Sequence, residues 1–232
     1  MRLVDHIRAV ALDLDGTLVD TAPDLAASAN AMLAAFGLAP LATQRIVELI
    51  GGGVERLVAG AFSRAAGRGP SPDELARAVD CFRASYARAF FERSRVYPGV
   101  IDGLRSLAAM ELKLACVTNK DSRFTRPLLE AAGLADLFAL VLCADRPSSR
   151  KPAPELLLAA CTHFRVSPHE LLYVGDSCID IATARAARCP VALVDYGYRN
   201  GGDASLAADA PDWIIATIGD VTKLKSHSRL AS

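Results

Sequence analysis

The sequence predicts an α/β fold: a doubly wound, Rossmann-like parallel sheet with an all-helical domain inserted into it. Short apolar runs bounded by turn residues are typical of buried strands. From the second run onward they alternate with helical patterns, which indicates right-handed βαβ units. Between the first and second runs the periodicity is helical, with no strand signal. The six runs are Ile7–Asp13, Leu112–Thr118, Ala139–Ala144, Leu171–Asp176, Val191–Asp195 and Trp213–Ile215.

Helix boundaries follow from capping residues. In the inserted segment, Thr21-Ala22-Pro23-Asp24 begins a helix that ends at Gly37, and Ser71-Pro72-Asp73-Glu74 begins another. Beyond the second strand, Asp121 begins a helix, and Ser167-Pro168-His169-Glu170 fits the start of a short one. We therefore expect a core domain made of residues 1–19 and 97–232, and a helical domain over residues 20–96.

Composition and charge narrow the classes of function. The chain is 52% hydrophobic and 22% charged, and its 26 basic and 26 acidic residues give a formal net charge of zero. This balance leaves no basic surface for nucleic acid or for a membrane, and no apolar run approaches the roughly 20 residues that span a bilayer. Six scattered cysteines without a C-x-x-C pair favour free thiols. We expect a soluble, cytoplasmic monomer or homodimer.

The first apolar run leads into an acidic turn, Asp13-Leu14-Asp15-Gly16-Thr17. Side chains two residues apart lie on the same face of a strand, so the Asp13 and Asp15 carboxylates point the same way. Burying two like charges together is unfavourable unless a cation lies between them or one is protonated. The pattern indicates a Mg²⁺ site with a nucleophilic carboxylate, and an ordinary acidic turn is the alternative.

Further polar residues follow the later strands. Thr118 and Asn119 come at the end of the second run, Lys151 lies in the loop after the third, and Asp176 ends the fourth, with Asp180 close behind. Ligands of open α/β sheets bind beyond the carboxyl ends of the strands, so we expect these groups in one crevice. Taken alone, Lys151 is explained as an ordinary solvated lysine, and Asp176 as a residue that caps the next helix. The ordered set favours a functional site.

With these motifs the sequence resembles the haloacid dehalogenase-like hydrolase superfamily over essentially its whole length. The resemblance is carried by Asp13–Thr17, Val117–Asn119, Lys151-Pro152 and Gly175–Asp180. Within the superfamily the chain is most similar to bacterial phosphoglycolate phosphatases, through Val19–Leu25, Thr118-Asn119-Lys120 and Tyr196-Gly197-Tyr198. The resemblance implies a Mg²⁺-dependent phosphatase acting on a small phosphorylated metabolite, with 2-phosphoglycolate as the expected substrate.

The resemblance also implies catalytic roles. Asp13 would attack phosphorus and form an aspartyl-phosphate, while Asp15 would protonate the leaving alkoxide and then activate water. Asp13, the backbone carbonyl of Asp15, and Asp176 would bind Mg²⁺, and Asp180 would support that site.

Binding roles are implied in the same way. Thr118, Asn119 and Lys151 would share the charge on the phosphoryl oxygens. The family's strand order, 3-2-1-4-5, would place the Asp13 strand at the centre of the sheet, between the strands that carry Thr118 and Asp176.

The inserted helices would be the family's cap, which closes over the crevice. The cap segment expected to face the substrate contains Gly52, Gly53 and Arg56, although a flexible turn between helices explains it equally well. Two residues depart from the family pattern. Arg188 ends a helix where relatives commonly have Gly, which predicts a left-handed arginine. Arg150 directly precedes the phosphate-binding lysine where relatives usually have a small or uncharged residue, which leaves the substrate preference open.

Three alternatives remain. The first is a same-fold phosphatase, a pyrophosphatase or a phosphomutase that acts on another small phosphate. The second is a haloacid dehalogenase, which uses the same nucleophile but needs neither Mg²⁺ nor a general acid, so Asp15 argues against it. The third is a non-catalytic phosphate-binding protein, which the full set of site residues disfavours.

Overall fold

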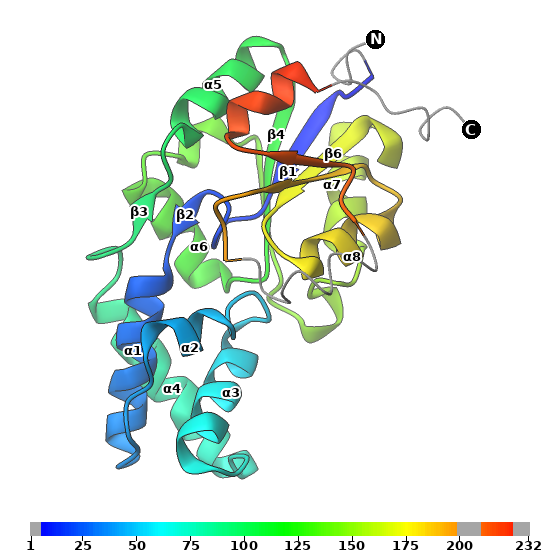
Figure 1. Ribbon diagram of the computed structural model, residues 1–232. Coiled ribbons are helices and arrows are strands. Elements are labelled where there is room, and N and C mark those ends of the chain that lie inside the picture. Colours follow the sequence, from blue (N-terminus) through cyan, green and yellow to red (C-terminus); the bar gives the residue numbers. More distant parts are fainter. Residues whose placement is uncertain (1–5, 199–209, 225–232) are drawn as a thin grey trace.

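A computed structural model describes residues 6–198 and 210–224, and a six-stranded parallel sheet lies at its centre (Figure 1). The strand order is β5-β4-β1-β6-β7-β8, so the strand that precedes Asp13 is central. All six predicted runs contain a strand, each within the expected bounds. The strands are β1 (Ala9–Leu12), β4 (Lys113–Thr118), β5 (Leu140–Cys143), β6 (Leu171–Gly175), β7 (Val191–Val194) and β8 (Trp213–Ile215).

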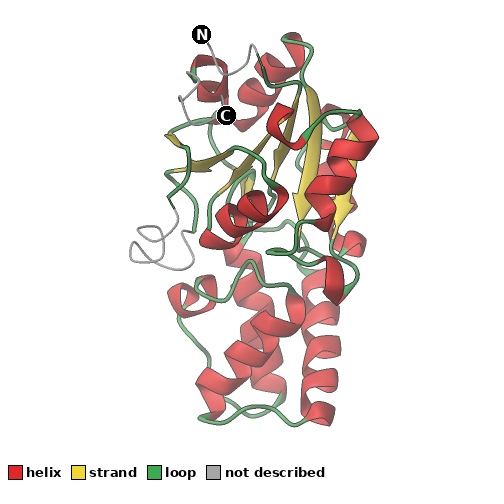
Figure 2. Ribbon diagram, turned by 90° about the vertical axis from the view of Figure 1, so that its right-hand side faces the viewer, coloured by secondary structure: helices red, strands yellow, loops and turns green. Residues whose placement is uncertain are grey.

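Helices cover both faces of the sheet, which confirms the doubly wound α/β core (Figures 1 and 2). Each face of the sheet has its own hydrophobic core, and alternate residues of β1 belong to one or the other. Val10 lies in the core that contains Leu104, and Ala11 lies in the core that contains Leu157. The first face is covered by α5 (Val100–Ala109), α6 (Ser122–Ala131) and the 3₁₀ helix η5 (Ile218–Lys223). The second is covered by α7 (Glu155–Phe164) and α8 (Cys178–Ala187).

The inserted helices have a hydrophobic core of their own. Met32, Ile46, Phe62 and Phe82 are buried in it, one from each helix. The helices are α1 (Ala22–Ala35), α2 (Thr43–Val47), α3 (Val54–Ala66) and α4 (Pro72–Arg88), and they lie beyond one end of the sheet (Figures 1 and 2). A separate core favours a separate folding unit. We propose residues 20–96 as a cap domain, and residues 1–19 and 97–232 as the core domain.

Two short strands that the sequence did not predict connect these parts. β2 (Val19–Asp20) and β3 (Arg95–Val96) pair in an antiparallel manner, Val19 with Val96 and Asp20 with Arg95. The expectation of no strand in this segment was therefore wrong, because two residues are too few to show an alternating pattern. The pairing places the point where the chain leaves the core beside the point where it returns to the core.

Local capping follows the sequence closely. Ser71 forms a full capping box with Glu74, the Asp121 side chain caps α6, and Ser167 begins only a 3₁₀ turn, η4 (Pro168–Glu170). Arg188 ends α8 in the left-handed region, with a φ of 59°, as its departure from glycine predicted. Two further 3₁₀ turns are η2 (Ala135–Leu137) and η3 (Pro147–Ser149). Within the described ranges, no helix combines the length and apolar character needed to cross a membrane.

Candidate active site

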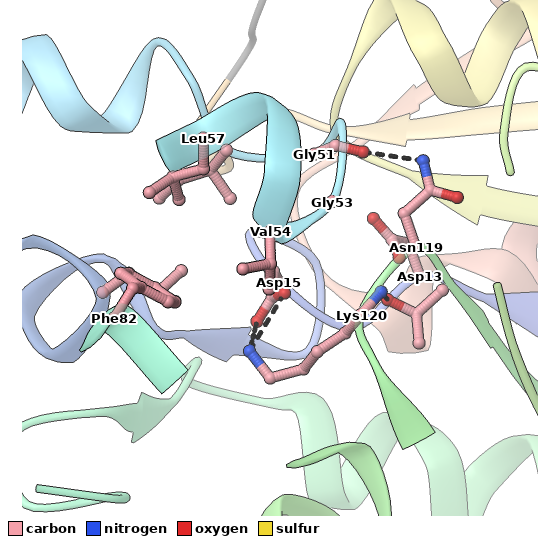
Figure 3. A pocket seen from close by; sticks show the side chains of 12 residues that line it. Asp13, Asp15, Gly51, Gly53, Val54, Leu57, Phe82, Asn119 and Lys120 are labelled. Carbon is pink, nitrogen blue, oxygen red and sulfur yellow. Dashed lines mark hydrogen bonds and ion pairs between the residues drawn. The ribbon is translucent and has the colours of Figure 1, made fainter. Parts of the chain in front are cut away.

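A cavity of about 40 Å³ lies between the carboxyl ends of the central strands and the inserted helices (Figure 3). Its core side is polar and its cap side is largely apolar. The core contributes Asp13, Asp15, Thr118, Asn119 and Lys120, and the insertion contributes Leu25, Ile50, Gly51, Gly53, Val54, Leu57 and Phe82. The polar residues come from the ends of β1 and β4, which are neighbours in the sheet. The parallel sheet therefore assembles this half of the site.

A buried lysine links two carboxylates beside this cavity. Lys151 Nζ lies 2.8 Å from Asp13 Oδ1 and 2.7 Å from Asp180 Oδ1. It also donates a hydrogen bond of 2.9 Å to the Tyr173 hydroxyl. Burial opposes the charge of an ammonium, but the two carboxylates outweigh burial and raise the pKa of Lys151 above its usual value. Lys151 is thus a fixed positive charge next to Asp13.

Asp180 is fully engaged by the protein. Its Oδ2 accepts hydrogen bonds from the Asp176 N–H (3.2 Å), the Ser177 N–H (3.1 Å) and the Ser177 hydroxyl (2.7 Å). Its Oδ1 accepts from Lys151 and from Tyr173. Burial raises the pKa of an acid, but here the ammonium and the hydrogen bonds hold the pKa of Asp180 below its ordinary value. Asp180 therefore fits a supporting role better than that of a metal ligand.

Asp13 and Asp176 carry the charge that a cation would balance. Carboxylate oxygens of Asp13, Asp176 and Asp180 lie within 4.8 Å of one another. Asp13 Oδ1 is buried without a well-aligned hydrogen bond, although the Lys151 ammonium is close. Burial raises the pKa of Asp13 to about 6, and burial together with neighbouring carboxylates raises that of Asp176 well above its ordinary value. An all-oxygen donor set of this kind fits a hard divalent cation.

Asn119 ties three parts of the site together. Its side-chain amide donates to the Lys151 carbonyl (3.1 Å) and to the Gly51 carbonyl (2.8 Å), and its oxygen accepts from the Lys151 N–H (2.8 Å). Figure 3 shows the contact with Gly51, which comes from the insertion. The buried Thr118 hydroxyl lies one residue earlier, where it accepts from the Lys120 N–H. The side chain of Asn119 thus positions the lysine loop against β4.

Asp15 is held differently from Asp13. Its carboxylate pairs with the Lys120 ammonium, at 3.0 Å for Oδ1 and 3.3 Å for Oδ2. Oδ1 also accepts a hydrogen bond of 2.6 Å from the Thr21 hydroxyl. Thr21 directly precedes α1, and its hydroxyl makes this contact instead of capping the helix. The second carboxylate of the pair is therefore linked to the start of the insertion.

Comparison with known proteins identifies the family. The family model described as haloacid dehalogenase-like hydrolase matches residues 10–194. The chain belongs to this family.

Relatives of this hydrolase share most of its length. A phosphoglycolate phosphatase of Nitrosospira multiformis is 45% identical over 223 residues, covering 96% of this chain and 97% of its own. The phosphoglycolate phosphatase of Escherichia coli is 35% identical, covering 95% and 93%. A crystal structure from Haemophilus somnus, described as a predicted phosphoglycolate phosphatase, superposes with a TM-score of 0.88 at 33% identity, covering 94% and 97%.

The structure of the hydrolase brings together most of the residues singled out in its sequence. The residues that surround one crevice are Asp13, Asp15, Thr118, Asn119, Lys151, Asp176 and Asp180. Of the three cap residues, Gly53 lines the cavity, whereas Gly52 is buried and does not line it. Arg56 is exposed and is not among the lining residues. Of these three residues only Gly53 therefore reaches the site, where its neighbours Gly51 and Val54 also line the cavity.

Arg150 is engaged by the cap. It forms an ion pair with Glu55 of α3, and Arg83 of α4 lies 3.4 Å from both Glu55 and Asp121. Partial burial opposes the charge of Glu55, but hydrogen bonds from its backbone and from Arg150 hold its pKa below the ordinary value. These groups line a neighbouring polar cavity of about 270 Å³. The unusual arginine therefore joins cap to core.

Sequence reasoning missed several residues of the site. Lys120 was part of the family resemblance but had no assigned role, and its position directly after Asn119 was the available signal. The Tyr198 N–H donates to Asp176 Oδ2 (2.7 Å), and its hydroxyl accepts from the Thr21 N–H (2.7 Å). Nothing in the sequence indicated a role for Tyr173, because a tyrosine in a buried strand is expected to belong to the hydrophobic core. These contacts connect residues that are far apart in the sequence.

Proposed function

We propose that this hydrolase is a Mg²⁺-dependent phosphatase that hydrolyses 2-phosphoglycolate through an aspartyl-phosphate on Asp13. This is a specific case of the phosphoric monoester hydrolysis that its family and its relatives indicate. One observation carries the proposal: two carboxylates two residues apart face one small cavity with different partners, Asp13 beside Lys151 and Asp15 beside Lys120. Different surroundings suit a nucleophile and a general acid.

In the first displacement, a carboxylate oxygen of Asp13 bonds to phosphorus as the bond from phosphorus to the alkoxide oxygen breaks. The Lys151 ammonium lies 2.8 Å from Asp13, close enough to stabilise charge on the transferring phosphoryl oxygens. The Thr118 hydroxyl and the Asn119 backbone N–H complete that binding. The fixed position of Lys151 between two carboxylates means that it needs no reorganisation during the reaction.

Asp15 acts on the other side of the bond that breaks. When its carboxyl group is protonated, Asp15 donates that proton to the leaving alkoxide, and the resulting carboxylate then takes a proton from the water that hydrolyses the aspartyl-phosphate. The contacts with Thr21 and Lys120 hold the carboxyl group in place. A haloacid dehalogenase needs no such group, so the pairing of Asp15 favours phosphatase chemistry.

Asp13, the backbone carbonyl of Asp15, and Asp176 would hold Mg²⁺, with Asp180 supporting them. Bound there, the ion would offset the repulsion between Asp13 and a dianionic phosphate. The buried and poorly compensated Asp13 and Asp176 support this assignment. None of the six cysteines is joined in a disulfide, which suits our proposal of a cytoplasmic location, as a monomer or homodimer.

Two measurements test the proposal. With Mg²⁺ and a panel of small phosphate esters, we expect kcat/KM to be highest for 2-phosphoglycolate. Another ester preferred by more than about tenfold, or 1.4 kcal/mol, would refute the substrate. Rapid quenching with labelled substrate should trap label on the wild-type protein and none on Asp13→Asn, whose turnover should fall by several decades. Turnover of folded Asp13→Asn close to the wild-type rate would refute the covalent mechanism.

A further inference from the structure

A buried ammonium faces the cap side of the active-site cavity. Lys120 follows β4, and only 4% of its side chain is exposed. Its Nζ pairs with Asp15 and lies 4.8 Å from the centre of the Tyr86 ring of α4 (Figure 3 shows the pair with Asp15). Among the described residues that line the cavity, it is the only one with a cationic side chain.

The surroundings of Lys120 are otherwise apolar on the cap side. Leu25, Ile50, Val54, Leu57 and Phe82 form that wall. Taking a lysine out of water is unfavourable unless its ammonium is well paired. The Asp15 carboxylate and the Tyr86 side chain are its neighbours, and an ammonium with three N–H groups can still donate to a further acceptor. A carboxylate placed in this cavity would find no other cation among the described residues that line it.

We propose that Lys120 determines substrate specificity by binding the carboxylate of the leaving group, so that the enzyme selects phosphate esters of small 2-hydroxy acids. This inference rests on the proposed phosphatase function and deepens it. Lys151 stabilises the phosphoryl group, which is common to all substrates. Lys120 binds the leaving group, which differs among them.

The geometry matches a 2-hydroxy acid. In such an ester a single carbon separates the bridging oxygen from the carboxylate carbon. Asp15 must reach the bridging oxygen in order to protonate it, and Lys120 Nζ is 3.0 Å from Asp15 Oδ1. Two hydrogen-bonded neighbours can therefore engage the alkoxide and the carboxylate of one molecule together.

Arg150 is the other candidate for recognising this carboxylate. It lines the neighbouring polar cavity, not the one that contains Asp13. Its guanidinium lies behind the Gly51–Gly53 loop, since a Cβ on Gly53 would meet it at 3.3 Å. Glu55 already neutralises it. The structure therefore favours Lys120 for the substrate and Arg150 for the contact between cap and core.

The test compares 2-phosphoglycolate with its neutral amide, 2-phosphoglycolamide, which has the same size and the same bridging oxygen. In Lys120→Met, kcat/KM for the acid should fall by about 10- to 100-fold more than kcat/KM for the amide, because the acid loses an ion pair with the ammonium, whereas the amide loses only a hydrogen bond to a neutral oxygen. Lys120→Arg should recover part of the preference. Lys113→Met removes the lysine at the other end of β4 and should leave both rates unchanged.

The outcomes separate this inference from the function on which it rests. If both esters lose activity equally in Lys120→Met, Lys120 only orients Asp15 and the inference is wrong. If the wild-type enzyme strongly prefers an ester without a carboxylate, the proposed substrate is wrong. If Lys120→Met fails to fold, competition in the wild type decides. Glycolate should then inhibit at a concentration about tenfold or more below that of glycolamide, and equal inhibition would overturn the inference.

Discussion

Two aspartates that share the Lys151 ammonium should respond oppositely to the loss of their charge. Burial raises the pKa of Asp13 from 3.8 to about 6, despite the lysine 2.8 Å away. Asp180 is equally buried, but the ammonium and several hydrogen bonds outweigh burial and lower its pKa. The charge of Asp13 therefore costs free energy of folding, whereas that of Asp180 contributes to it.

The magnitude and its pH range follow from linkage. A pKa that rises from 3.8 to about 6 on folding costs about 3 kcal/mol once both states are ionised. The cost is absent below about pH 4, where the carboxyl is protonated in both states, and is complete above about pH 6. At pH 8, without metal, Asp13→Asn should raise the free energy of unfolding by up to about 3 kcal/mol. Asp180→Asn should lower it by about 3–5 kcal/mol, because it breaks a buried ion pair.

Urea unfolding in EDTA at pH 8 and pH 5 measures both changes, with Asp80→Asn on the exposed face of α4 as the control. With a urea m value of about 1–3 kcal/mol per M, a change of about 3 kcal/mol moves the unfolding midpoint by about 1 M or more, so both shifts are easily resolved. At pH 5 the gain from Asp13→Asn should shrink to about half. A loss of stability in Asp13→Asn at pH 8, or a gain independent of pH, would show that burial does not govern this carboxyl.

Three further outcomes are expected. EDTA should abolish activity and Mg²⁺ should restore it. Ca²⁺ should bind but support little turnover, because it prefers more ligands at longer distances. Full activity after exhaustive chelation would show that the reaction does not need a metal ion. Lys151→Ala should lower kcat/KM for 2-phosphoglycolate and p-nitrophenyl phosphate alike, since it removes charge stabilisation common to both, and a strong shift in their ratio would contradict this. Gly53→Ala should change the ratio of kcat/KM for the two esters, because Gly53 lines the cavity with a φ of 85°. Arg56→Ala should leave this ratio unchanged, because Arg56 is exposed. The reverse pattern would show that Arg56, and not Gly53, affects the choice of substrate.

Local pattern alone was enough to predict the six strands of the main sheet, the helical character of the insertion and the residues of the core motifs, but not the short strands β2 and β3. Strand and helix periods are properties of neighbouring residues, and the carboxyl ends of parallel strands share one edge of a sheet. The sequence therefore determined that Asp13, Thr118 and Asp176 would gather, even though they come from different strands. It also indicated the left-handed Arg188, because a helix end depends only on the last turn.

The partners of these residues were decided by the tertiary structure. The pairing of Lys120 with Asp15 spans 105 positions of sequence, and the contact of Tyr198 with Thr21 spans 177. No periodic pattern encodes such contacts, because they depend on how segments far apart in the sequence pack against one another. The same relation places Arg56 in solvent and Gly53 at the cavity, although only two residues lie between them. Whether a side chain near a motif reaches the substrate is thus set by packing between cap and core.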